Sequence, residues 1–217
     1  MQILKYCGMT CEEDYQLVLT SKATHIGFIF AKESKRYVEP EEVRRWVTKF
    51  GKGQKKLVGV FVNESMEQVW NTALQVPLDV IQLHGAETIE DVRGLKTQGA
   101  AEVWKAIPHS DQTIEKMQEY ADVVDAFLID SKVKGQFGGT GQAFNWGFVP
   151  VYQRFAKTAG IPCIIAGGID ADNMVQLSSY GIDGIDVSSG IETNGRKDGE
   201  KIQKIEREIP HDISSSR

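Results

Sequence analysis

The chain has 217 residues, of which 41% are hydrophobic and 25% are charged, proportions typical of a folded globular protein rather than a disordered or fibrous one. It carries 25 Lys and Arg against 30 Asp and Glu, a formal net charge of −5 at pH 7. This acidic balance offers no basic surface for nucleic acid or for an anionic membrane, so we expect neither as a partner.

The N-terminal residues 1–7 have neither the basic region nor the apolar region of a secretory signal. No later stretch approaches the ~20 apolar residues needed to cross a bilayer. The cysteines, Cys7, Cys11 and Cys163, are odd in number and show no C-x-x-C spacing, so we expect free thiols rather than disulfides or a structural zinc site. These features predict a cytoplasmic protein.

Eight short apolar runs, bounded by Gly, Asp, Asn or Pro, predict β-strands along the chain. They are residues 3–7, 25–30, 57–62, 79–83, 102–107, 125–129, 162–166 and 183–188. The segments between them have helical periodicity and helix start signals. Residues 10–13 have the pattern of a capping box, and Pro40 stands in the expected first turn of a later helix.

The predicted strands begin at residues 3, 25, 57, 79, 102, 125, 162 and 183, so each interval has about the length of one strand and one helix. Eight such units predict a single-domain α/β fold, a (β/α)₈ TIM barrel over residues 1–207 with a polar C-terminal tail over residues 208–217. A doubly wound sheet with extra strands is the alternative. The two longest intervals predict long loops over residues 32–37 and 132–145, where barrels carry their active sites.

Two predicted strands end on groups that transfer protons. Cys7 ends the first strand, and Asp130 follows the sixth. The carboxyl ends of barrel strands form the active site, so this thiol and carboxyl could supply the base and the acid of an isomerisation. Lys5 shares the inward face of the first strand with Cys7, and its ammonium would favour the thiolate. A buried structural cysteine and a helix-capping aspartate are the alternatives.

Small residues follow the seventh and eighth predicted strands, at Gly167 and Gly168 and at Ser189 and Gly190. Loops at these places bind phosphate in such barrels, because glycine lets backbone amides approach an anion. The alternative is that the glycines form ordinary turns and the serine caps an ordinary helix. The helix after Gly168 is expected to begin near residue 170. Residues 138–141 lack the Lys-Ser/Thr of a Walker loop and no G-x-G-x-x-G opens a helix, so neither ATP nor a dinucleotide is expected.

Three further polar residues are candidate substrate ligands. Arg36, in the first long loop, could pair bidentately with a carboxylate or simply be solvated. His84 shares the inward face of its strand with Gln82, and could donate to a substrate oxygen or be structural. Asp186 could hold a substrate hydroxyl or pair with Lys5. The remaining histidines, at positions 25, 109 and 211, are scattered, so we expect no metal.

Seven short motifs fall in chain order at the ends of the predicted strands. They are residues 5–8 (KYCG), 27–30 with 34–38 (GFIF, SKRYV), 82–85 (QLHG), 130–131 (DS), 138–141 with 144–146 (GGTG, FNW), 166–168 (AGG) and 186–192 (DVSSGIE). Together, from residue 3 to about residue 202, they resemble the phosphoribosylanthranilate isomerase family of tryptophan biosynthesis.

This resemblance implies an Amadori rearrangement of N-(5-phosphoribosyl)anthranilate to a 1-deoxyribulose 5-phosphate product, without a cofactor. It places the general base on Cys7, the general acid on Asp130 and the carboxylate-binding arginine on Arg36. It places the phosphate loops on Gly141, Gly167, Gly168, Ser189 and Gly190. The chain departs from the family pattern with Lys35 in place of proline and Asn145 in place of aspartate.

Two other functions would use the same features. Fold and phosphate loops transfer between activities, so another phosphosugar isomerase or epimerase is one alternative. A barrel that binds a phosphorylated ligand without turning it over, as a sensor, is the other. In each case the expected ligand is a small phosphosugar, and the expected assembly is a monomer or a homodimer.

Overall fold

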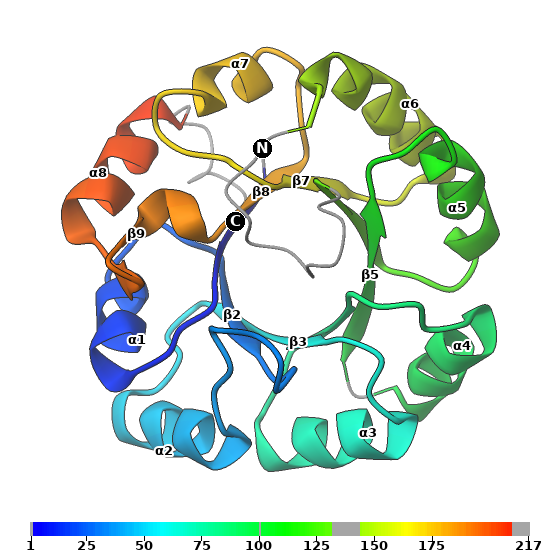
Figure 1. Ribbon diagram of the computed structural model, residues 1–217. Helices are drawn as coiled ribbons and strands as arrows, with labels where there is room; N and C mark the ends of the chain where they lie inside the picture. The colour runs from blue at the N-terminus through cyan, green and yellow to red at the C-terminus, as the bar shows by residue number, and fades with distance from the viewer. Residues whose placement is uncertain (1, 100, 132–143, 210–217) are drawn as a thin grey trace.

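Eight parallel strands close into a barrel at the centre of the protein (Figure 1). The structure is a computed structural model, and it describes residues 2–99, 101–131 and 144–209. Each strand pairs with its neighbours in chain order and the last pairs with the first, which confirms the predicted (β/α)₈ barrel and excludes the doubly wound sheet. The strands are β1 (Ile3–Cys7), β2 (His25–Ile29), β3 (Lys56–Phe61), β4 (Val80–Leu83), β5 (Glu102–Pro108), β6 (Ala126–Asp130), β7 (Cys163–Ala166) and β8 (Gly184–Val187).

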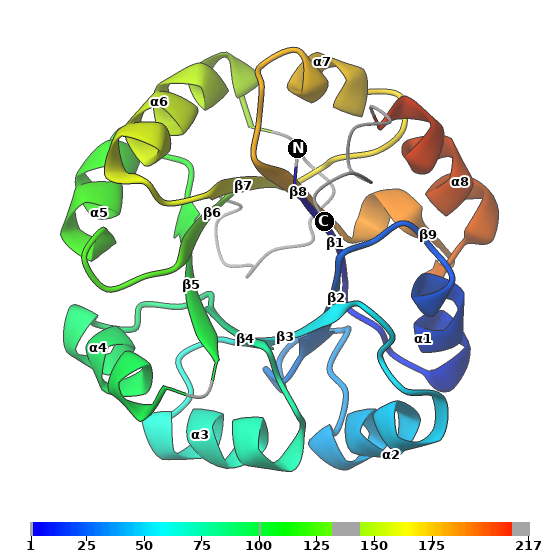
Figure 2. The same ribbon diagram turned by 180° about the vertical axis from the view of Figure 1, so that it is seen from behind.

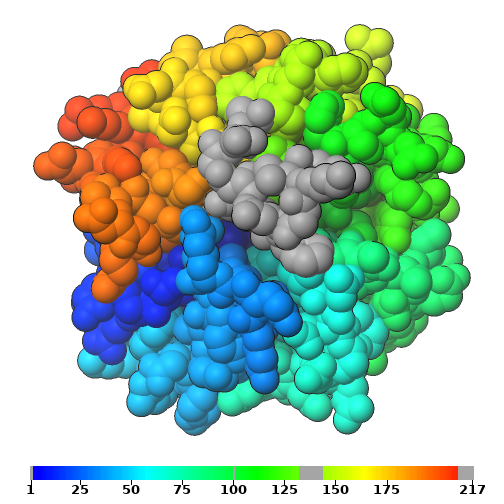
Figure 3. Space-filling model, in the orientation of Figure 1, coloured from blue at the N-terminus to red at the C-terminus, as the bar shows by residue number. Residues whose placement is uncertain are grey.

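A ring of helices surrounds the barrel (Figures 1 and 2). The helices are α1 (Glu12–Leu19), α2 (Pro40–Phe50), α3 (Met66–Gln75), α4 (Ile89–Gln98), α5 (Thr113–Tyr120), α6 (Val149–Ala159), α7 (Met174–Ser178) and α8 (Gly199–Glu208). The 3-10 turns η1 (Trp146–Phe148) and η2 (Ser189–Ile191) and a small hairpin of β9 (Glu192–Thr193) and β10 (Arg196–Lys197) lie in the loops. In Figure 3 the colours run once round the molecule, so consecutive βα units are neighbours. Among these helices, none is long and apolar enough to span a membrane.

Local sequence signals start several of these helices. Thr88 forms a capping box at the start of α4, and Pro40 occupies the first turn of α2, as predicted. At α1 the predicted capping box over residues 10–13 is wrong. The cap is Cys11, whose thiol accepts from the amide of Asp14, while the Thr10 hydroxyl donates to the Asp14 carboxylate instead of capping the helix.

The segment after β7 also differs from its prediction. A helix was expected from near residue 170, but α7 begins at Met174 and has only five residues. The Asp170 side chain accepts from the amides of Asp172 and Asn173 and so forms a turn where the first helical turn was expected. The loop after β7 therefore presents a turn, not a helix N-terminus, to the rim of the barrel.

The barrel interior changes from apolar to polar along the strands. Val58, Val80, Leu128 and Ile164 belong to one buried apolar cluster. Side chains two residues apart on a strand share a face. The next inward positions on the same strands are Val60, Gln82, Asp130 and Ala166, which line a cavity. A larger apolar cluster packs the outer faces of the strands against the helices. The apolar layer thus forms the floor beneath the polar rim.

His25 is buried at the start of β2, and its ring lies 5.0 Å from the Trp104 indole between centroids. Burial, together with the nearby Lys56 and Lys5 ammonium groups, lowers the pKa of His25 to about 3. Its Nε2 is buried without a hydrogen-bond partner among the described residues. The folded protein therefore holds His25 in its neutral form.

We predict that His25 makes folding sensitive to acid. An unfolded histidine titrates at about pH 6.5, so between that pH and about pH 3 the unfolded chain binds a proton that the folded chain does not. The contribution of neutral His25 to the unfolding free energy is fully present above pH 6.5 and is lost as the pH falls toward the folded-state pKa. Between pH 7 and pH 5, the unfolding free energy of the wild type should fall by about 2 kcal/mol more than that of His25→Gln, as measured by urea denaturation. An equal loss in both proteins would show that His25 titrates normally.

Candidate active site

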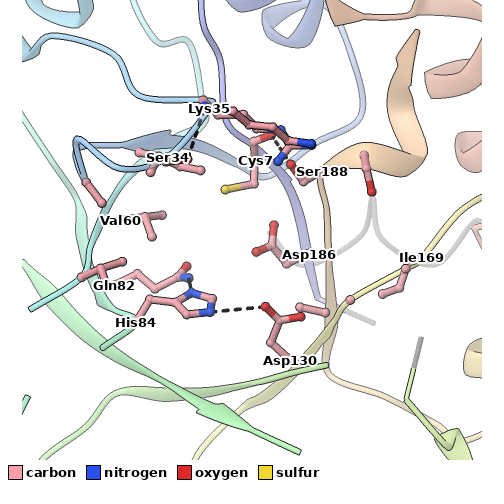
Figure 4. Close-up of a pocket in the computed structure, with 18 of the residues that line it drawn as sticks. Cys7, Ser34, Lys35, Val60, Gln82, His84, Asp130, Ile169, Asp186 and Ser188 are labelled. Carbon is pink, nitrogen blue, oxygen red and sulfur yellow. Dashed lines mark hydrogen bonds and ion pairs between the residues drawn. The ribbon is translucent and has the colours of Figure 1, made fainter. Parts of the chain in front are cut away.

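A cavity of about 580 Å³ opens at the carboxyl ends of the barrel strands (Figure 4). Its wall includes most of the predicted site residues, namely Cys7, Arg36, His84, Asp130, Gly167, Gly168, Asp186 and Ser189. Gly190 lines a neighbouring cavity, and Gly141 lies outside the described residues. Within the described ranges, His, Cys, Asp and Glu side chains do not gather in any group of three or more that could hold a metal ion.

Cys7 ends β1 with its thiol in the cavity wall and only 6% of the residue exposed. Gly27 on β2 makes room for the thiol, because a Cβ at that position would lie 2.7 Å from the Cys7 Sγ. Burial raises the pKa of the Cys7 thiol, and the nearby Lys5 ammonium offsets part of that rise. The neutral thiol is therefore favoured at rest, and a cation lies where it can stabilise the thiolate.

Lys5 and Asp186 form a buried ion pair inside the barrel. Lys5 Nζ lies 2.7 Å from Asp186 Oδ2, and the two residues are in register on β1 and β8. Burial lowers the pKa of Lys5, but its surroundings, with the Asp186 carboxylate foremost, raise it by more, so the lysine is charged. The other oxygen of Asp186, Oδ1, is buried without a hydrogen-bond partner among the described residues. Asp186 thus pairs with Lys5 and keeps an acceptor for a ligand in the cavity.

Asp130 ends β6 and points into the cavity from a different side than Cys7 (Figure 4). His84 Nε2 lies 3.3 Å from Asp130 Oδ2, and Gln82 Nε2 lies 3.1 Å from His84 Nδ1. With Gln82 donating to Nδ1, a neutral His84 ring carries its proton on Nε2, the nitrogen that faces Asp130. The Ser131 amide donates to the other Asp130 oxygen at 2.7 Å. His84 therefore lies beside Asp130 in the cavity, a contact that the sequence did not predict.

Arg36 reaches the cavity wall from the loop after β2, although only 5% of the residue is exposed. Its Nε and Nη2 donate to the two carboxylate oxygens of Glu192 at 2.8 and 2.7 Å. Lys197 Nζ donates to Glu192 at 2.7 Å and also to the backbone carbonyl of Cys7. Neither Glu192 nor Lys197 is predicted from the sequence as a site residue. Glu192 closes the last of the seven motifs, which was an available signal, whereas no motif includes Lys197.

The loops after β7 and β8 carry the predicted phosphate-binding residues. Gly167 and Gly168 have φ angles of 87° and 65°, which glycine adopts without strain. At Gly190 a side chain would collide with the backbone of the β7 loop. A second cavity, of about 350 Å³, is lined by residues 168–172, by Ser189 and Gly190, and by Lys201 and Lys204. These two lysines are not predicted from the sequence as site residues, because lysines at this spacing are common on exposed helix faces.

Residues 4–208 match the family model described as N-(5'phosphoribosyl)anthranilate (PRA) isomerase. The chain belongs to the PRA isomerase family. A relative from Priestia megaterium, named N-(5'-phosphoribosyl)anthranilate isomerase, is 53% identical over 95% of this chain and 99% of its own. A relative of the same name from Bacillus subtilis is 45% identical over 98% of this chain and 97% of its own.

Solved structures of PRA isomerases share the fold of this chain. The enzyme from Thermotoga maritima superposes with a TM-score of 0.83 at 31% identity, covering 96% of this chain and 98% of its own. A PRA isomerase in complex with reduced 1-(o-carboxyphenylamino)-1-deoxyribulose 5-phosphate superposes with a TM-score of 0.78 at 30% identity, covering 94% and 96%. The family assignment therefore extends over the whole described barrel.

In this PRA isomerase family member, we predict that Gly167→Ala lowers turnover by at least ~10-fold. A Cβ at Gly167 would lie 2.7 Å from Asp130 Oδ1 and 2.5 Å from Ser131 Oγ, so the Asp130 carboxyl would have to move. Gly181→Ala is the matched control, because Gly181 has a φ of 63° but no atom within 4 Å of its Cβ position. Both variants should lose about 1–3 kcal/mol of stability from backbone strain. Equal steady-state turnover in the two folded variants would contradict the prediction.

Proposed function

We propose that the protein converts N-(5'-phosphoribosyl)anthranilate to 1-(2-carboxyphenylamino)-1-deoxyribulose 5-phosphate, an Amadori rearrangement in tryptophan biosynthesis, with Cys7 as general base and Asp130 as general acid. The observation that carries this proposal is the meeting of a thiol and a carboxyl in one cavity of a chain that matches the PRA isomerase family over residues 4–208. The reaction moves protons within one substrate and transfers no electrons to another molecule.

In the first step Asp130 gives a proton to the ring oxygen of the ribose. The bond between C1′ and the ring oxygen breaks, and the nitrogen lone pair forms a C1′=N iminium. The Ser131 amide, which donates to one oxygen of Asp130, helps to hold the carboxyl at the end of β6. A fixed acid near the leaving oxygen lowers the barrier because no reorientation is needed during proton transfer.

In the second step Cys7 acts as a thiolate and removes the proton from C2′, which the adjacent iminium has made acidic. The C–H electrons form a C1′=C2′ double bond, and the iminium electrons return to nitrogen, which gives an enolamine. The enolamine then gains a proton at C1′ and loses the proton of its C2′ hydroxyl, which gives the ketone. The Lys5 ammonium would stabilise the thiolate, and the free Oδ1 of Asp186 would accept a bond from a ribose hydroxyl.

The two ends of the substrate would be held by different groups. Arg36 would bind the anthranilate carboxylate as a charge-assisted pair. The backbone amides of the loops after β7 and β8, at Gly167, Gly168, Ser189 and Gly190, would bind the phosphate, and Gly141 would complete that site. The lysines of α8 that line the second cavity would add positive charge next to the phosphate.

We further propose that the protein works in the cytoplasm as a monomer or homodimer, with one domain over residues 1–207 and a polar tail over residues 208–217. Free thiols at Cys7, Cys11 and Cys163 fit a reducing compartment. One structure of the Thermotoga maritima relative is described as a mutually generated monomer of a dimeric protein, which supports a homodimer.

We predict that Cys7→Ser and Asp130→Asn each lower kcat by at least ~10²-fold, the usual scale for the loss of a general acid or base. Turnover would be followed with phosphoribosylanthranilate generated in situ and with EDTA present. Cys11→Ser is the matched control, since serine is a good helix cap at the start of α1 and the residue lies outside the cavity wall. Near-normal turnover in a folded Cys7 or Asp130 variant would show that its assigned role is wrong.

A separate prediction concerns Arg36. Arg36→Met should raise KM by about 10- to 100-fold, the loss of a charge-assisted carboxylate contact, while kcat changes little. Circular dichroism and thermal melting would verify that the variant is folded. A large fall in kcat at unchanged KM would place Arg36 in the chemical step instead of in binding.

A further inference from the structure

Behind the cavity wall lies a buried cluster of three charged side chains, Arg36, Glu192 and Lys197. Their side chains are 6%, 8% and 1% exposed. Of the three, only Arg36 lines the cavity. Glu192 and Lys197 come from the β9–β10 hairpin, which lies in the loop after β8. A ligand in the cavity would therefore touch Arg36 and meet the other two only through it.

The contact between Arg36 and Glu192 uses one edge of the guanidinium. Nε and Nη2, at 2.8 and 2.7 Å from the carboxylate oxygens, form the side edge. A guanidinium has five N–H donors in a fixed plane, so the end edge formed by Nη1 and Nη2 keeps its donors. Among the described residues the Arg36 side chain makes no other hydrogen bond. One arginine can thus hold Glu192 on one edge and a second carboxylate on the other.

Several contacts hold the Arg36 guanidinium in this orientation. Lys197 fixes Glu192 from the hairpin and also donates to the Cys7 carbonyl. The Arg36 stem crosses the chain at Gly8, where a Cβ would lie 2.6 Å from its Cδ. The hairpin therefore supplies the rigidity that a proline beside Arg36 would give, at the position where this chain has Lys35.

In the cluster two basic side chains, Arg36 and Lys197, face the single carboxylate of Glu192, and burial lowers the pKa of Lys197. Burial raises the pKa of Glu192, but Arg36 and Lys197 lower it by more, so the group is ionised. The neighbouring Lys5–Asp186 pair is neutral in sum. The Arg36 guanidinium is charged, so its free edge suits one added anion, such as a substrate carboxylate.

We propose that Glu192 is a positioning residue that acts through Arg36: it holds the side edge of the guanidinium so that the end edge receives the substrate carboxylate, and it thereby sets the preference for a carboxylated aromatic amine. This inference rests on the proposed isomerase function and names the group that orients its carboxylate contact. Two physical roles of Glu192 predict opposite outcomes. As a charge alone, Glu192 repels a substrate carboxylate, so its removal would strengthen binding. As a positioning group, its removal weakens binding.

The test measures binding of two ligands by titration calorimetry. One is reduced 1-(2-carboxyphenylamino)-1-deoxyribulose 5-phosphate, and the other is the same compound with a phenyl group in place of the carboxyphenyl group. The ratio of their Kd values reports the preference for the carboxylate. General damage to the barrel would weaken the binding of both ligands and leave this ratio unchanged. Glu192→Gln should lower this preference by about tenfold, the effect of losing one charge-assisted hydrogen bond, and should raise KM with kcat within about twofold.

A double-mutant cycle shows whether Glu192 acts through Arg36. Arg36→Met should abolish the preference, and adding Glu192→Gln to Arg36→Met should change it no further. Glu192→Asp keeps the charge but withdraws the carboxylate by one methylene, so it should also lose preference. Glu42→Gln is the control, because in the part of the chain that the structure describes Glu42 pairs only with exposed Arg45 on α2, and it should leave the ratio unchanged.

Unchanged or increased preference in Glu192→Gln would overturn the proposal, as would additive losses in the double mutant. If Glu192→Gln does not fold, an unchanged preference in Glu192→Asp overturns it equally. Wild-type turnover of phosphoribosylanthranilate is measured alongside. Its absence would refute the proposed function, whereas normal turnover with an unaltered ratio in the Glu192 variants would refute only the positioning role.

Discussion

The pairing of the first strand with the last is the constraint on which the structure depends. β8 lies beside β1 with Lys5 opposite Asp186, and their side chains meet at 2.7 Å inside the barrel. This pairing closes the sheet, and closure brings the carboxyl ends of all eight strands to one rim. Cys7 and Asp130, from the first and sixth strands, can face one cavity only because that rim is continuous. The same ion pair sets the charge beside the Cys7 thiol, so it links the fold to the proposed chemistry.

The charged groups at the rim are costly to bury. Lys5, Asp186, Arg36, Glu192 and Lys197 each lose hydration on folding, and a buried ion pair often stabilises a protein no more than apolar side chains of similar size would. Below them the barrel is filled by an apolar cluster, so the sequence can pack this space without charge. Stability alone therefore does not explain the two buried charged groups, which are the Lys5–Asp186 pair and the cluster of Arg36, Glu192 and Lys197. The proposed stabilisation of a thiolate and the proposed binding of a carboxylate would explain them, because both need cations held in a site with little water.

The barrel and most of its rim could be predicted because both leave a local pattern in the sequence. Strands buried on both faces appear as continuous apolar runs, and the residue that ends each run lies on the rim, which located Cys7 and Asp130. The Cys11 cap, the late start of α7 and the β9–β10 hairpin leave no such pattern. A thiol is not a usual helix cap, Asp170 replaces a helical turn by a local bond, and two-residue strands have no alternation to detect. The pairing of Glu192 with Arg36 joins residues 156 apart in the chain and exists only in the closed barrel.

The most direct test of the central claim, that the rim presents a base and an acid to one phosphosugar, is a crystal structure of this protein with reduced 1-(2-carboxyphenylamino)-1-deoxyribulose 5-phosphate. We expect C2 of the ligand next to the Cys7 thiol and the oxygen on C4, which is the ring oxygen of the substrate, within hydrogen-bond reach of Asp130. We expect the carboxylate at Arg36 and the phosphate between the loops after β7 and β8. A ligand bound with C2 away from Cys7, or with no oxygen in reach of Asp130, would contradict the assignment.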